Sequence, residues 1–260
     1  MSDISLDPFE QATKTAVDTV TNTPSFQRSL DNFVYRLFRR PNQKAEMMRV
    51  EDTIALEQYK ENLLSGYHSI PNEHQTQPKR CIVEPAFDES LYYLEEPELI
   101  KLFENVILSS ADARYSKYNH PAFVSIIKQL SPLDASNLKL FKDKSSLPLV
   151  DYVYDYPNGR YHVFQPDVFL ENPKEQDIEL QAVSIRNLAR LALLEIPEKD
   201  LAKVNNPSLY AKYKETPLYL EHLDKHASGQ HPDKILRIGM ICSYAALTPF
   251  GKSFIKVCVR

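Results

Sequence analysis

Two histidines stand four residues apart in the segment 221–226, which reads EHLDKH. On a helix, His222 and His226 would lie on one face and could share a metal ion. A zinc protease carries Glu directly after its first His as a general base, but this chain has Leu223 there. No pair of cysteines flanks the segment to complete a structural zinc site. We therefore interpret it as an exposed loop or a frayed helix and expect no bound metal.

His120 is a second candidate, because it could act as a general base with Asp112 and Arg114 upstream of it in the sequence. A simpler role follows from Pro121, which is typical of the first turn of a helix. The ring of His120 could then contact the free amide groups of that helix, a role that Asn119 could serve equally. The sequence favours the capping role.

The chain has three cysteines, Cys81, Cys242 and Cys258. A nucleophilic cysteine needs a lowered pKa and a nearby histidine. Cys242 stands in an apolar strand pattern and Cys258 on an apolar helix face, so both are predicted to be buried. Cys81 follows two basic residues and is the most reactive candidate of the three. An odd and sparse set of cysteines is typical of a reduced, cytoplasmic protein.

The five glycines exclude two nucleotide-binding motifs. No two of them are closer than ten residues, whereas a phosphate-binding loop needs several within a short stretch. Both the P-loop and the dinucleotide fingerprint are therefore missing from the sequence. We expect no cofactor.

Basic residues gather in two segments, although the net charge of the whole chain is −4. One lies between residues 28 and 49, and its candidate contacts for nucleic acid or a partner are Arg36, Arg39 and Arg40. The other follows Asp233, after which no acid occurs, and its candidate contacts are Arg237, Lys252 and Lys256. Either segment could meet phosphates, and the first could also lie on an anionic membrane. The alternative is a solvated face that balances an acidic surface of the same chain.

The elements that would position these residues are clearest between residues 96 and 141. Pro97 opens a helix, and its apolar side chains fall at i, i+3, i+4, i+7 and i+8. They are Leu99, Leu102, Phe103, Val106 and Ile107. A second helix begins near Pro121 and a third at Ser131, where Asp134 three residues on suggests a capping box. Three amphipathic helices so close in sequence are expected to pack on one another.

The remaining elements follow from other local patterns. Tyr152 and Tyr154 alternate with polar residues before an Asn158-Gly159 turn, which is typical of a β-hairpin. The tyrosines of this hairpin could stack on bases, but strand packing is favoured. A helix is predicted over 176–196, a strand over 234–247 and a last helix after Thr248. Residues 8–20, 24–41 and 43–64 are also predicted to be helical.

Composition places the chain among ordinary globular proteins, with 43% hydrophobic and 25% charged residues in 260. It lacks a run of about 18 apolar residues, so no transmembrane segment is expected. Residues 1–70 are predicted as an N-terminal helical region, 71–85 as a linker or strap and 86–260 as an α+β domain. The expected fold class is mostly α with a small β component.

Three short motifs follow one another along the chain. They are Leu99-x-x-Leu102-Phe103 followed by His120-Pro121-x-Phe123-Val124, then Ile127-x-x-Leu130-Ser131-Pro132-Leu133-Asp134-Ala135, and finally Leu247-Thr248-x-Phe250-Gly251-Lys252-x-Phe254. This order resembles the abortive infection alpha family, a bacterial group associated with phage defence, over roughly residues 70–260. The helix that holds Arg186 to Leu191 is similar to a helix of that family, although Ala192 stands where the family usually has Gly. The resemblance implies a context but no catalytic residues.

The end of the chain is also similar to a winged-helix domain. In such domains a strand often runs into Leu-Thr-x-x-Gly and a closing helix, as Leu247 to Gly251 does here. The helix over 176–196 would then stand in the position of the recognition helix. The resemblance implies a helical bundle with a winged-helix-like C-terminal half.

We therefore expect a cytoplasmic bacterial protein that acts without catalysis, as a sensor, regulator or effector of antiphage defence. Its expected partner is a protein or phage component, DNA or a second copy of the chain. One alternative is an enzyme, a nuclease or hydrolase, whose site the sequence does not reveal. Another is a membrane-surface effector that uses residues 24–40.

Overall fold

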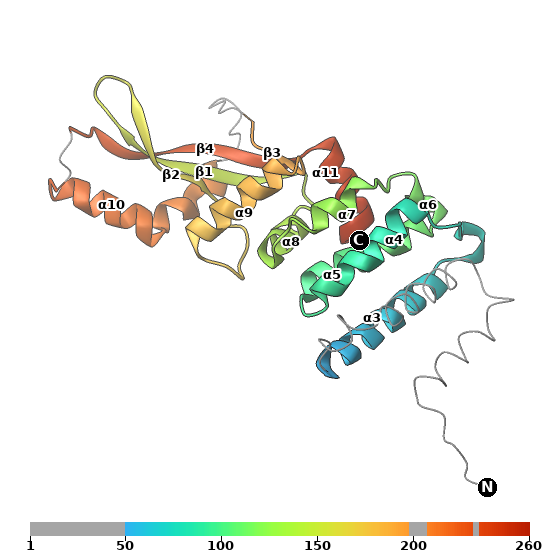
Figure 1. Cartoon of the computed structure of the whole chain (residues 1–260). Helices are drawn as coiled ribbons and strands as arrows, with labels where there is room; N and C mark the ends of the chain where they lie inside the picture. Colours follow the sequence, from blue (N-terminus) through green and yellow to red (C-terminus); the bar gives the residue numbers. More distant parts are fainter. Residues whose placement is uncertain (1–49, 198–206, 231–233) are drawn as a thin grey trace, which may run out of the picture. The chain divides into compact units, whose positions relative to one another are not determined.

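The computed structural model describes residues 50–197, 207–230 and 234–260 (Figure 1). The elements are α3 (Val50–His68), η1 (Asn72–His74), α4 (Arg80–Ser90), η2 (Leu91–Tyr93), α5 (Pro97–Ser110), α6 (Ala113–Ser116), α7 (Ala122–Ile127), α8 (Pro132–Lys139), β1 (Ser146–Asp155), β2 (Tyr161–Val168), α9 (Ile178–Arg190), β3 (Leu194–Glu195), η4 (Pro207–Glu215), α10 (Pro217–Ala227), β4 (Arg237–Leu247), α11 (Pro249–Phe254) and η5 (Ile255–Val259). The described chain is mostly helical with one small sheet, which confirms the predicted fold class. The helices predicted over 8–20 and 24–41 lie outside the described residues.

The chain divides into two compact units. Among the described residues, unit 1 comprises 50–129 together with Lys256–Cys258 and Arg260, and unit 2 comprises those from 130 to 255 with Val259. Residues 71–85, predicted as a linker or strap, hold η1 and the first half of α4. The predicted domain limits at residues 70 and 86 stay a prediction.

Helix α5 is the central helix of unit 1 and packs against α3, α4, α6 and α7. All five residues of the predicted apolar stripe are buried, and Pro97 stands in the first turn as expected. Each fully buried large side chain contributes about 1.5–3 kcal/mol. Burial extends beyond this stripe, because every residue from Leu102 to Ser110 is buried. Its polar residues therefore need partners inside the protein.

Short polar contacts begin the next two helices, as the sequence predicted. The Nδ1 atom of His120 accepts the backbone N–H of Ala122 at 3.1 Å, at the start of α7. In α8, Ser131 Oγ accepts from the N–H of Asp134, and the Asp134 carboxylate accepts from the N–H of Ser131. The predicted capping box is confirmed with Asp in the place of the usual Glu.

The sheet of unit 2 is antiparallel, with strand order β2-β1-β4-β3. The predicted hairpin joins β1 to β2 through a turn in which Gly159 has a φ of 75°. Such a backbone conformation favours glycine, which explains the Asn-Gly pair in the sequence. The strand predicted over 234–247 is β4, which pairs with β1 along its whole length. The winged-helix-like arrangement stays a prediction.

Four buried tyrosines lie between the sheet and the segments η4 and α10, and they donate hydrogen bonds to main-chain carbonyl groups. The hydroxyl of Tyr152 donates to the carbonyl of Tyr213 at 2.5 Å, and that of Tyr210 donates to Ser243 at 2.7 Å. Tyr213 and Tyr219 reach the strand carbonyls of Pro148 and Ile238. Burial raises the pKa of Tyr152 to about 12. Of the hairpin tyrosines, Tyr152 therefore packs inside unit 2, and base stacking by the others stays a prediction.

A β-bulge ties α9 to the sheet. The pairing of β1 with β2 shifts between Val150↔Val168 and Tyr152↔Gln165, so Asp151 faces two residues. One of them, Asp167, has a φ of 55° and donates its N–H to Asp151 Oδ1 at 2.9 Å. The guanidinium of Arg186 in α9 binds both carboxylate oxygens of Asp167. This pairing holds the otherwise unfavourable backbone of Asp167.

A buried polar network joins α8 to α9. The Asn137 amide donates to Gln181 Oε1 at 2.8 Å and to Ser184 Oγ at 2.9 Å. Its oxygen accepts from the amide of Asn172 at 2.7 Å. Because each member has a partner, the network can be buried without a large penalty. It fixes which face of α9 meets α8.

Helix α9 ends at Arg190, earlier than the predicted end at residue 196. Ala192 follows with a φ of 56°, and the N–H of Leu193 donates to the carbonyl of Leu188. This is the left-handed helix end that glycine usually makes. The prediction extended the helix because the apolar pattern continues, but those residues enter β3 instead.

The motif Thr248-x-x-Gly251 caps a helix and also lets two backbone segments lie close together. Thr248 Oγ1 accepts the N–H of Gly251 at 2.8 Å and begins α11, as predicted. A Cβ atom on Gly251 would lie 2.0 Å from the carbonyl oxygen of Leu193. Only glycine therefore lets α11 approach the chain before β3 so closely.

None of the helices in the described part of the chain is both long and apolar enough to cross a bilayer.

Ala192→Gly should raise the free energy of unfolding by about 0.5–1 kcal/mol, because glycine adopts the left-handed conformation without a steric penalty. Chemical denaturation measures this change. The matched control is Ala189→Gly inside α9, which should lower the free energy of unfolding by a similar amount. Equal destabilisation by both variants would contradict the strain at Ala192.

Gly251→Ala should lower the free energy of unfolding by about 1–3 kcal/mol or more, because the added methyl group collides with a backbone oxygen that cannot move freely. The neighbouring Lys252→Ala, which alters an exposed side chain, should stay within about 0.5 kcal/mol of the wild type. Thermal and chemical unfolding of both variants test the close approach. A Gly251→Ala protein as stable as the wild type would refute it.

Candidate functional site

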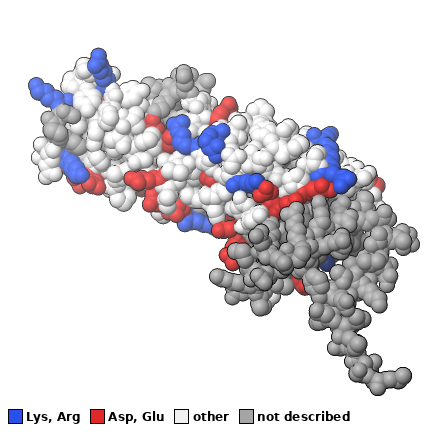
Figure 2. Space-filling model, viewed as in Figure 1, with Lys and Arg blue, Asp and Glu red and all other residues white. Residues whose placement is uncertain are grey.

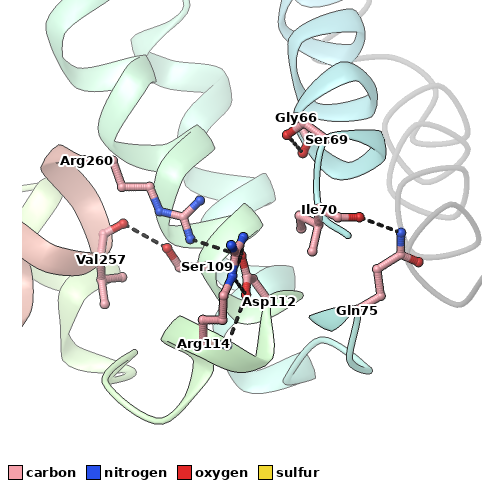
Figure 3. Close-up of polar contacts among 9 residues, drawn as sticks. All are labelled: Gly66, Ser69, Ile70, Gln75, Ser109, Asp112, Arg114, Val257 and Arg260. Carbon is pink, nitrogen blue, oxygen red and sulfur yellow. Dashed lines mark hydrogen bonds and ion pairs between the residues drawn. The ribbon is translucent and has the colours of Figure 1, made fainter. Parts of the chain in front are cut away.

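A polar stripe runs along α5 and continues past its end. Asn105, Ser109 and Asp112 stand at i, i+4 and i+7, so they share one side of the helix. The Asn105 amide donates to the carbonyl of Cys258 at 2.8 Å, and Ser109 Oγ donates to the carbonyl of Val257 at 2.9 Å. Figure 3 shows Ser109 reaching Val257 beside the charged end of the stripe. The stripe thus faces the C-terminal segment of unit 1.

The reason for these contacts lies in the helix end itself. The last carbonyl groups of a helix have no partner within the helix. Val257 and Cys258 belong to η5 and are buried, so water cannot satisfy their carbonyl groups. Two side chains of α5, more than a hundred residues earlier, supply the missing donors.

Asp112 is the charged end of the stripe, and its side chain is completely buried. The guanidinium of Arg114 binds it, with Nη2 at 2.7 Å from Oδ2, and Arg260 Nη2 lies 4.0 Å from the same oxygen (Figure 3). Burial alone would raise the pKa of Asp112. The hydrogen bonds and charge of Arg114, with the charge of Arg260, outweigh burial and hold that pKa below its usual value.

Two tyrosines beside Asp112 lie against cations. The guanidinium carbon of Arg260 is 4.0 Å from the ring centroid of Tyr115, and that of Arg114 is 5.6 Å away. Lys256 Nζ is 3.7 Å from the ring centroid of Tyr118, and Lys117 Nζ is 5.1 Å away. A hydrogen bond from Lys256 and the charges of both lysines lower the pKa of Tyr118. We call these six residues the tyrosine–cation cluster.

Of the two interpretations of the histidine pair, an exposed loop or a frayed helix, the loop is wrong. Both residues belong to α10, which Thr216 caps through its side chain. The ring of His222 stacks on Phe164 with centroids 4.3 Å apart, and its Nδ1 lies 2.6 Å from the hydroxyl of Tyr154. The polar segment is helical because this packing against the sheet adds to a weak local signal. Within the described residues, no three His, Cys, Asp or Glu side chains gather as a metal site.

Of the two cysteines predicted to be buried, Cys258 is buried and Cys242 is only half-buried. Cys258 is buried, and burial raises the pKa of its thiol well above the usual value. Cys242 is half-buried in β4, and burial raises its thiol pKa as well. Cys81 is exposed on α4. A raised pKa makes a thiol a poor nucleophile at neutral pH.

The structure describes three of the six predicted basic contacts. Arg36, Arg39 and Arg40 lie outside the described residues. Arg237 forms an ion pair with Asp155, with Nε 2.6 Å from Oδ2, and Lys252 is exposed on α11. On the face drawn in Figure 2, Lys and Arg side chains lie in small groups with acidic side chains beside several of them. Of the three that the structure describes, Lys256 belongs to the tyrosine–cation cluster, and binding by any of the six stays a prediction.

Sequence reasoning missed the stripe and the cluster. The pair Ser109-Ser110 was interpreted only as the end of a helix. The signal available was the spacing of three polar residues, Asn105, Ser109 and Asp112, along the mostly apolar second half of the helix and just past its end. Arg114 is a local partner of Asp112, but nothing local indicates that Arg260 is its second partner.

The motif residues shared with the family have structural roles. His120 and Pro121 begin α7, Phe123 and Leu130 are buried, and Ser131 with Asp134 forms the capping box. Thr248 and Gly251 shape the start of α11. The fold and these contacts define a mostly helical protein in which the motif serves folding.

Comparison with protein families matches residues 51–258 to the family described as abortive infection alpha. Because this match spans most of the chain, the protein belongs to the abortive infection alpha family. Membership suggests a role in defence of the abortive-infection kind.

Two other comparisons add little. No curated protein matches the chain. A solved structure described as an uncharacterized protein from the hydrocarbon-degrading marine bacterium Alcanivorax borkumensis SK2 is similar, with 12% identity and a TM-score of 0.35. The likeness covers 57% of this chain and 96% of that one. At such a TM-score it supports no conclusion about this fold.

Asp112→Asn should lower the free energy of unfolding by about 2–4 kcal/mol at neutral pH, because a buried ion pair loses its anion. Since its folded-state pKa is depressed, Asp112 contributes fully above its unfolded-state pKa near 3.8. That contribution is lost as the pH falls through the lower folded-state pKa. The difference between wild type and variant, measured by denaturation across pH, should therefore shrink in acid.

Asp88→Asn is the matched control, because Asp88 is exposed on α4 of the same unit. It should change the free energy of unfolding by less than about 0.5 kcal/mol. A difference for Asp112→Asn that does not depend on pH would contradict the electrostatic account.

Proposed function

We propose that this protein is a sensor, regulator or effector of abortive-infection defence against phage and that it acts by binding another macromolecule. The observation that carries the proposal is the family match over residues 51–258. A defence protein of this kind limits phage spread by stopping the growth of the infected cell. The chain would do so by contact rather than by catalysing a reaction.

The positions of the chemically reactive side chains support contact over catalysis. His120 accepts a backbone N–H at a helix start, which a general base would have to release. Asp112 is enclosed by two guanidinium groups, and Cys258 is buried with a raised pKa. Each of these three side chains therefore serves the fold. An enzymatic function would need other residues to supply a reaction centre.

A bacterial host that expresses the chain should form fewer and smaller phage plaques than a host carrying the same gene with an early stop codon. At low multiplicity of infection the culture should survive, and at high multiplicity it should stop growing while it releases little phage. Plating efficiency and growth curves measure both effects. Plaques and growth curves equal to those of the control, across a panel of unrelated phages, would count against a defence role.

His120→Asn separates contact from catalysis. Asparagine is a favoured cap and keeps an acceptor for the helix start, but it cannot act as a base at neutral pH. The variant should therefore protect the host as well as the wild type. Loss of protection in a variant that is still folded, as judged by its thermal unfolding, would favour the enzyme alternative.

A further inference from the structure

The tyrosine–cation cluster brings together two segments that are far apart in the sequence. Arg114, Tyr115, Lys117 and Tyr118 lie in and just after α6, whereas Lys256 and Arg260 belong to the C-terminal segment of unit 1. Each ring has two cations within 5.6 Å of its centroid. The cluster therefore alternates aromatic rings with positive charges over a short distance.

The charge of the cluster is not balanced. Two carboxylates act on it among the described residues: Asp112 is completely buried and faces Arg114 and Arg260, and the exposed Glu73 acts on Arg114 through its charge. Lys117 and Lys256 are both exposed, and no ion pair joins either of them to a carboxylate among the described residues. Lys79 adds a further cation, with its Nζ 3.2 Å from the carbonyl of Ser116. An anionic partner would find several donors and no exposed acid among the residues of the cluster itself.

The two tyrosine rings determine which kind of anionic partner fits the tyrosine–cation cluster best. A cation over an exposed ring contributes only about 0.5–1 kcal/mol, so a phosphate can draw the lysines away at little cost. The half-buried rings of Tyr115 and Tyr118 then offer faces on which bases can stack. Stacking requires bases outside a duplex, which favours a single strand.

A membrane surface fits less well. Binding in the interface of a bilayer needs exposed apolar side chains beside the cations. The exposed large hydrophobic residues of the described chain include none in 113–118 or 256–260. An acidic protein could meet the lysines but would make no use of the rings.

We propose that the tyrosine–cation cluster binds single-stranded nucleic acid, with Lys117, Lys256 and Arg114 on phosphates and the two tyrosines against bases. The inference deepens the proposed function, on which it rests for its biological meaning, because it names the class of macromolecule. Arg260 stays on Asp112 and positions the C-terminal segment.

The test is fluorescence anisotropy with the full chain and labelled single strands of about 15 nucleotides, one of RNA and one of DNA. The wild type should bind at least one strand, with an affinity that falls as salt rises. The variant with both Lys117→Ala and Lys256→Ala should bind about tenfold more weakly, and the slope of log affinity against log salt should fall by about 1.4. A variant with both Lys139→Ala and Lys174→Ala removes two exposed charges from unit 2 and should bind like the wild type.

Tyr118→Ala should weaken binding about 5- to 150-fold, whereas Tyr118→Phe keeps the ring and should leave binding unchanged. Far-ultraviolet circular dichroism and thermal unfolding check that each variant is folded. Vesicles rich in anionic lipid and poly-glutamate serve as competitors and should not displace the strand at matched charge.

No binding of either strand at low salt would overturn the proposal, and so would equal losses in the two double-lysine variants. An unchanged affinity of folded Tyr118→Ala, or displacement by vesicles or poly-glutamate at matched charge, would also overturn it. These outcomes are distinct from a failure of the proposed function, because plaque protection can persist without nucleic-acid binding and binding can occur without protection.

Discussion

A buried carboxylate must meet positive charge inside the protein, and Asp112 imposes that requirement on unit 1. Leaving such an anion alone in a low-dielectric interior would cost several kcal/mol. Arg114 supplies one positive charge from nearby, because it follows Asp112 by two residues and lies with it at the start of α6. Arg260 supplies a second positive charge from the C-terminal segment of unit 1. The same side of α5 also provides the donors for the carbonyls of Val257 and Cys258, so one helix holds the whole C-terminal segment.

The motif that places the chain in its family consists mainly of local folding signals. His120 and the Ser131–Asp134 pair begin helices, and Gly251 permits a backbone approach that a methyl group would block. Ala192 is a similar case, because its φ of 56° is a backbone conformation that favours glycine. In this chain these residues serve the fold. They do not indicate chemistry, so the function must be sought on surfaces that the motif does not cover.

The sequence predicted what depends on neighbours in the chain. Caps, first-turn prolines, the Asn-Gly turn and the apolar stripe of α5 each act over fewer than about ten residues, and all were found. The end of α9 and the packing of His222 were not predicted, because they depend on β3 and on the ring of Phe164. The second partner of Asp112, Arg260, is almost 150 residues away. No local pattern predicts a contact between residues so far apart in the sequence, although the unusual polar residues of α5 indicated that this side of the helix needs polar partners.

The polar contacts of the C-terminal segment give register more than stability. Replacing a buried ion pair by apolar residues is often neutral or stabilising, and Val257, Cys258 and Val259 are alike enough that apolar packing alone would tolerate a shift. A shift would break the hydrogen bonds to the carbonyls of Val257 and Cys258 and would move the charge of Arg260 away from Asp112. With that register, Arg260 falls over Tyr115, and Lys256, four residues earlier, falls over Tyr118, three residues later. A shift by one residue would remove both pairings, so the buried stripe also determines which cations the surface presents.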